Sequence, residues 1–87
     1  MKCSTVVVPW DDGLKFRTAA RIMRTAQAFR SSVVLRCGDR IADMRSILGI
    51  VALCASMGAN LTVEASGDDE AGVIDAITQV FDDGELD

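Results

Sequence analysis

An alternating stretch and the turn that follows it decide the fold: Asn60-Leu61-Thr62-Val63-Glu64-Ala65-Ser66-Gly67-Asp68-Asp69-Glu70. Apolar side chains recur at every second position from Leu61 to Ala65, and Thr62 and Glu64 lie between them, which predicts a strand with one buried face. Gly67 ends this strand, and the acids after it favour the positive end of a helix. The helix predicted next buries a set of apolar residues before an acidic tail over 82–87: Val73, Ile74, Ala76, Ile77, Val80 and Phe81.

The residues before this segment supply the remaining elements. Thr5 to Pro9 is rich in β-branched residues and predicts a first strand, and a 3.6-residue apolar period predicts a helix from Phe16 to Arg30. The apolar face of that helix contains Phe16, Ala19, Ile22, Met23, Ala26 and Phe29. A β-hairpin is predicted over 33–44, and a helix from the N-cap Ser46 to the C′ glycine Gly58.

The resulting order is β-α-β-β-α-β-α. Because each element has a single apolar side, we expect a two-layer α+β domain in which helices cover one face of a four-stranded antiparallel sheet. The chain has 87 residues, of which 49% are hydrophobic. This length predicts one domain over residues 1–87 with one hydrophobic core.

Composition excludes several kinds of chemistry. The chain contains no histidine, so no imidazole can act as a general base, nucleophile or metal ligand. Three cysteines without C-x-x-C spacing suggest neither a disulfide framework nor a zinc site, and they fit a reducing cytoplasm. The longest apolar stretch, Ile47 to Ala55, is too short to span a membrane. We therefore expect a cytoplasmic protein without a metal or cofactor.

Charge is distributed unevenly along the chain, whose net charge is −4. All nine basic residues precede Ser46, so residues 1–45, with four acids, carry 9 − 4 = +5, while residues 46–87 carry nine acids and no base. This asymmetry predicts an anion or an acidic protein surface as the partner of the N-terminal half. The acidic total argues against nucleic acid.

Two basic features lie in that half. Arg17, Arg21 and Arg24 are spaced i, i+4, i+7 and form one stripe on the first predicted helix, opposite its apolar face. Lys15 and Arg17 lie at the start of the helix, where free amides favour anions. This is a candidate anion site, and the alternative is a solvated basic surface after an ordinary glycine turn.

The second predicted helix is apolar on all sides. Ile50, Leu53, Cys54 and Met57 form one side, and the other side contains Ile47, Leu48, Val51, Ala52 and Ala55. A small two-layer domain cannot easily bury both, so the second side predicts a partner-binding patch, with ordinary packing or an oligomer contact as the alternative. Ser46 at the start of this helix is an N-cap, and a phosphate on it would place charge beside Arg45 and next to that patch.

Three motifs resemble the HPr family of the bacterial sugar phosphotransferase system. They are Gly13-Leu14-x-x-Arg17-x-Ala19-Ala20, Arg45-Ser46-Ile47-Leu48-Gly49-Ile50 and the segment Gly58 to Glu70. The resemblance covers essentially the whole chain. It implies an open-faced β-sandwich with the element order derived above.

The family relays a phosphoryl group through a histidine, and this chain has Lys15 at that position and Thr18 in place of the usual proline. An imidazole with a pKa near 6.5 is largely neutral at pH 7, whereas a lysine side chain, with an ordinary pKa of about 10.4, is a cation and cannot attack phosphorus. We therefore expect a protein that is not an enzyme and does not relay phosphate.

The resemblance also implies a regulatory phosphoserine at Ser46 and an interaction surface of Arg17, Arg21, Arg24, Ile47, Leu48 and Val51. Its expected partners are enzyme I and other phosphotransferase components, an HPr-type kinase and a transcriptional regulator. The family has a catabolite-repression branch that lacks the histidine and regulates instead of relaying phosphate. This chain resembles that branch. We expect a regulatory binding module, a monomer or weak dimer. The alternatives are constitutive docking without modification, or phosphate transfer through another acceptor such as Thr18, Cys37 or Cys54.

Overall fold

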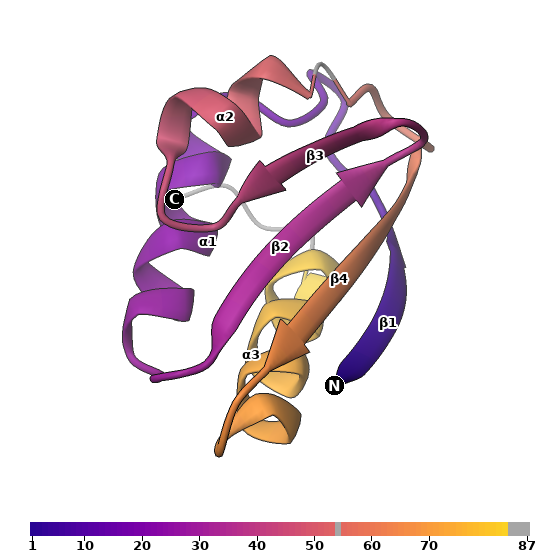
Figure 1. The fold of residues 1–87 in the computed structure, drawn as a ribbon. Coiled ribbons are helices and arrows are strands. Elements are labelled where there is room, and N and C mark those ends of the chain that lie inside the picture. Colours follow the sequence, from indigo (N-terminus) through magenta and orange to yellow (C-terminus); the bar gives the residue numbers. More distant parts are fainter. Residues whose placement is uncertain (54, 84–87) are drawn as a thin grey trace.

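Four strands pair antiparallel into one sheet in the computed structural model, which describes residues 1–53 and 55–83. The strands are β1 (Lys2–Val7), β2 (Ser32–Cys37), β3 (Arg40–Asp43) and β4 (Asn60–Ser66), in the order β1-β4-β2-β3. The helices are α1 (Phe16–Gln27), α2 (Ile47–Ala52) and α3 (Glu70–Asp83), and α3 passes behind β4 in Figure 1. The element order and the α+β class predicted from sequence are confirmed.

One face of the sheet forms the core. Leu61, Val63 and Ala65 of β4 are buried, as predicted, together with the inward residues Val33 and Leu35 of β2. α1 and α3 add Ile22, Ala26, Val73 and Ile77 to the same cluster. The other face of the sheet is uncovered, which completes the two-layer arrangement.

The predicted hairpin is β2–β3. Cys37 pairs with Arg40, so the loop is the two residues Gly38 and Asp39, and Gly38 has φ +60°, which suits a tight hairpin turn. β3 ends at Asp43, one residue before the predicted end. Ile41 is 54% exposed on the uncovered face.

Several predicted boundaries are wrong. The first strand was expected from Thr5 to Pro9, but β1 runs from Lys2 to Val7, because it pairs with β4 from Lys2 opposite Ala65 to Val7 opposite Asn60. α1 ends at Gln27 and not at Arg30.

A residue far away in the sequence sets the end of α1. The backbone N–H groups of Arg30 and Ser31 donate to the carboxylate of Asp69, both at 2.9 Å, which draws the chain out of the helix. At the start of α1, Phe16 is 61% exposed, so its predicted place on the buried face is also wrong. Ile22 and Ala26 occupy that face as predicted.

The second helix is shorter than predicted. α2 ends at Ala52, whose carbonyl accepts from the Arg40 guanidinium at 3.3 Å, and Gly58 lies in a later turn with φ +86°. The chain after α2 is drawn away because the carbonyl of Ala55 accepts the N–H of Leu14 at 2.9 Å.

Two side chains after α2 therefore reverse their predicted positions. Met57, expected in the core, is 59% exposed, and Ala55, expected on the partner side, is buried. Cys54 and the tail beyond Asp83 lie outside the described residues.

Among residues 1–53 and 55–83, no helix is long and apolar enough to cross a membrane. The same residues contain no cluster of three or more histidine, cysteine or acidic side chains suited to a metal ion.

Candidate functional site

Lys15 is the N-cap residue of α1 and is exposed. Its backbone is held by the buried side chain of Thr18, whose Oγ1 accepts the Lys15 N–H at 3.1 Å and donates to the Lys15 carbonyl at 3.0 Å. Ala19 N–H donates to the same carbonyl at 2.8 Å and begins the helix. The Lys15 side chain forms no ion pair with an acid among residues 1–53 and 55–83.

The loop before Lys15 is joined to the segment after α2. Leu14 N–H donates to the Ala55 carbonyl at 2.9 Å, and Val8 exchanges hydrogen bonds with Ala59 and Gly58. Gly13 lies at the closest approach, with φ +78°, where a Cβ atom would come within 2.5 Å of the Ala55 carbonyl oxygen. Glycine at position 13 therefore lets the loop before Lys15 approach the segment after α2.

Lys15 lies between two hollows. One, of about 170 Å³, is lined by Trp10, Asp12, Gly13, Lys15, Arg17 and Thr18. The other, of about 330 Å³, is lined by Asp12, Leu14, Lys15, Val51, Ala55 and Ser56. The fold thus brings Lys15 beside Arg17 on one side and beside Val51 of α2 on the other, two of the residues predicted to bind partners.

The arginine stripe is engaged within the chain. Arg17, Arg21 and Arg24 all have interaction partners, and Nη2 of Arg21 lies 3.5 Å from Oδ2 of Asp83 at the end of α3. The stripe was predicted from the helical period, but its pairing with α3 was not. No local pattern could indicate it, because the two residues lie on different helices.

Ser46 is the N-cap of α2, as predicted. Its Oγ accepts the Gly49 N–H at 3.0 Å, and Ser46 is exposed. A Cβ atom on residue 49 would lie only 3.1 Å from this oxygen, so glycine leaves room around the hydroxyl. Ser46 lines neither hollow beside Lys15.

The residues of the predicted apolar patch on α2 differ in how much of their surface is exposed. Leu48 is 77% exposed, whereas Ile47 and Val51 are half-buried against the core. Of these three residues, Leu48 alone has most of its surface available to a partner.

Arg45, expected beside a phosphate on Ser46, is paired with Asp43. Asp43 Oδ1 accepts the Arg45 backbone N–H at 2.8 Å, and its Oδ2 lies 3.2 Å from Nη2 of Arg45. The hydrogen bonds from Arg45 lower the pKa of the Asp43 carboxyl. Arg45 would have to leave this partner to reach a phosphate.

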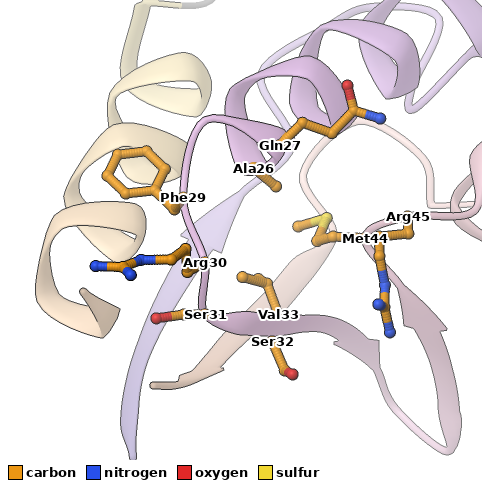
Figure 2. Close-up of a pocket in the computed structure, with 9 residues that line it drawn as sticks. All are labelled: Ala26, Gln27, Phe29, Arg30, Ser31, Ser32, Val33, Met44 and Arg45. Carbon is orange, nitrogen blue, oxygen red and sulfur yellow. The ribbon is translucent and has the colours of Figure 1, made fainter. Parts of the chain in front are cut away.

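A third hollow, of about 230 Å³, was not foreseen from the sequence. It lies between the end of α1, the start of β2 and the end of β3, and its lining is Ala26, Gln27, Phe29, Arg30, Ser31, Ser32, Val33, Met44 and Arg45. Figure 2 shows that Arg30 and Ser31 point toward α3 and away from Met44. The charged and hydroxyl groups on that side therefore do not converge on its centre.

The residues considered as other phosphate acceptors differ in access. Thr18 is 2% exposed and its hydroxyl is used by Lys15. Cys37 is half-buried and packs against the core. Cys54 is outside the described residues.

Comparison with known proteins gives consistent matches. The family model described as "PTS HPr component phosphorylation site" matches residues 2–83. The Multiphosphoryl transfer protein of Xanthomonas campestris pv. campestris is 32% identical over 75 residues, which are 86% of this chain and 9% of that protein. The chain thus spans less than a tenth of that relative.

Solved structures match over nearly the whole chain. HPr-C-His from Thermoanaerobacter tengcongensis is 31% identical with a TM-score of 0.91, covering 97% of this chain and 94% of that one. The Bacillus subtilis catabolite repression protein Crh, solved as a swapped, intertwined dimer, is 29% identical with a TM-score of 0.77 and full coverage of both chains.

Proposed function

This chain belongs to the HPr family of the bacterial sugar phosphotransferase system, and we propose that it is a regulatory binding module of that family that carries no phosphoryl group itself. It acts in the cytoplasm and binds phosphotransferase components of the enzyme I type, an HPr-type kinase or a transcriptional regulator. No catalysis, metal or cofactor is part of this function.

The observation that carries the proposal is the residue at position 15. The chain contains no histidine, and the resemblance to the family aligns Lys15, exposed at the start of α1, with the family's phosphohistidine. A hydrated ammonium lacks the lone pair that a phosphoryl acceptor needs. Lys15 and Arg17 instead supply fixed positive charge to an anion or an acidic protein surface.

The proposed interaction surface joins two helices. α1 contributes Arg17, Arg21 and Arg24, and α2 contributes Ile47, Leu48 and Val51. The hollow shared by Lys15 and Val51 supports one continuous surface across these helices. Exposed Leu48 is its apolar anchor, and the arginines select acidic partners.

Ser46 is the proposed switch. Its hydroxyl is exposed and lies two residues from Leu48, so a phosphate there would add about −1.5 to −2 charges beside the apolar anchor. The partner set would then change without a change of fold. Incubation with an HPr-type kinase and ATP should phosphorylate Ser46. If mass spectrometry found no phosphate on Ser46 after this incubation, the result would contradict the switch.

The second candidate is constitutive docking to phosphotransferase components without modification. The permanent charge of Lys15 and the exposed Leu48 favour it, because neither depends on a phosphate. Titration with enzyme I separates the two candidates, since Leu48→Asp abolishes binding in both and Ser46→Asp weakens it only where Ser46 is the switch. A phosphocarrier using another acceptor would be revealed by label from phosphoenolpyruvate and enzyme I on the unmodified chain.

A further inference from the structure

The last turn of α3 contacts the basic stripe of α1. Oδ2 of Asp83 lies 3.5 Å from Nη2 of Arg21, and the two side chains are 38% and 20% exposed. The other oxygen of Asp83 accepts from Nε2 of Gln79, one turn earlier, at 3.2 Å. Gln79 thus helps to hold the carboxylate in place at the end of the helix.

Asp83 offers the arginine stripe the same kind of acidic group that a protein partner would offer. Arg21 is the central arginine of the stripe, and α1 has no acid in its first turn. The last turn of α3 has no base, and its negative helix end adds to Asp82 and Asp83. The chain's own acidic turn therefore satisfies the arginine that an acidic partner would use.

We propose that this turn of α3 is an internal competitor, which reduces the affinity of acidic protein partners for the arginine stripe by occupying Arg21. The proposal rests on the proposed function, because it requires a partner that docks on this stripe. A partner must displace Asp83 before it reaches the guanidinium. Because the pair is partly exposed, the competition is expected to cost the partner about two- to fivefold in affinity.

Two neighbouring variants isolate the effect. Asp83→Asn and Asp82→Asn change the net charge equally, but the side chain of Asp82 makes no hydrogen bond or ion pair with the described part of the chain. Each is titrated with enzyme I by calorimetry at low ionic strength, and thermal unfolding followed by Trp10 fluorescence verifies that each variant is folded. We expect Asp83→Asn to bind about two- to fivefold more tightly than Asp82→Asn.

A combined variant tests whether Arg21 is the contested residue. Arg21→Gln should weaken enzyme I binding. In the Arg21→Gln background, Asp83→Asn should raise the affinity for enzyme I no more than Asp82→Asn does. Equal affinities for Asp83→Asn and Asp82→Asn, or weaker binding by Asp83→Asn, would overturn the competitor while leaving the docking function intact. Absence of binding by the unmodified chain and by every variant would overturn the proposed function and the competitor together.

Discussion

Ser31 donates both its backbone N–H and its hydroxyl to the carboxylate of Asp69. The same carboxylate accepts the N–H of Arg30, so one side chain just before α3 holds the whole turn between α1 and β2. Gly67 lies against this turn, where a Cβ atom would come within 2.6 Å of the Ser31 Oγ. The contact joins two turns that lie 38 residues apart.

These hydrogen bonds, first among them that from the Ser31 hydroxyl, lower the pKa of the Asp69 carboxyl. A lowered pKa in the folded state stabilises the fold fully above the unfolded value of about 3.9, and this contribution is lost as the pH falls through the folded value. Asp69→Asn should therefore unfold at lower urea concentration at pH 7 and lose less stability between pH 5 and pH 2. Trp10 fluorescence during urea unfolding measures both effects.

The matched control for this change is Asp68→Asn. Asp68 is exposed and its side chain makes no hydrogen bond or ion pair with the described residues, so its replacement should leave the pH profile as it is. A profile that Asp69→Asn leaves unchanged would contradict the role given to the Ser31 contact.

Gly13→Ala tests the close approach of the Lys15 loop to the segment after α2. The new methyl group would meet the Ala55 carbonyl oxygen at 2.5 Å in a residue with φ +78°. Gly38→Ala has a similar φ of +60° but open space around it, so it isolates the backbone cost of about 1–2 kcal/mol. We expect Gly13→Ala to lower the free energy of unfolding by about 1–3 kcal/mol more than Gly38→Ala does, because of overpacking. Equal losses in urea unfolding would contradict the clash.

Two substitutions separate the structural role of Ser46 as an N-cap from its proposed regulatory role. Ser46→Ala removes the hydrogen bond to Gly49 N–H and should lower the free energy of unfolding by about 1 kcal/mol. Ser46→Asp supplies another good N-cap and should keep the stability while weakening enzyme I binding through its charge near Leu48. Ser66→Ala, at an exposed serine at the end of β4 and outside the docking surface, should change neither quantity. Thermal unfolding measures the stability, and calorimetric titration measures the affinity for enzyme I.

Leu48→Asp tests the apolar anchor. Leu48 is 77% exposed on α2, so the change should leave the unfolding midpoint nearly constant and abolish enzyme I binding, a loss of more than about tenfold in affinity. Ile41→Asp places the same charge on an apolar residue of the uncovered sheet face, 54% exposed, and should bind as the unmodified chain does. Similar losses for both variants would indicate a general charge effect.

Lys15→His should restore a phosphate acceptor if the docking surface is intact. A largely neutral imidazole has the lone pair that the ammonium lacks. Radiolabel from phosphoenolpyruvate and enzyme I is expected on Lys15→His and not on the unmodified chain. Lys15→Gln removes the cation without adding an acceptor and should stay unlabelled. Label on the unmodified chain would contradict the absence of relay.

The sequence predicted those elements whose signal is local. The alternation around Val63 and the two-residue loop at Gly38 placed the strands, and the Ser46 cap was found from residue type and position alone. Each of these features depends on neighbours within a few residues.

The helix ends were missed because distant residues set them. α1 stops where Asp69 takes the N–H groups of Arg30 and Ser31, and α2 gives way to a chain drawn toward Leu14. The apolar period continued past both points and predicted longer helices. For the same reason the pairing of Arg21 with Asp83 could not be inferred, although the stripe itself could.

The position of β1 has a consequence for how the molecule is made. Within residues 1–53 and 55–83, β1 is an edge strand of the sheet and pairs with β4, from Lys2 opposite Ala65 to Val7 opposite Asn60. During synthesis the first strand must wait until the ribosome has released the residues of β4, and Val6 and Val8 stay unburied meanwhile. Such non-local pairing slows folding, so the nascent chain is expected to complete its sheet late, after the β2–β3 hairpin has formed.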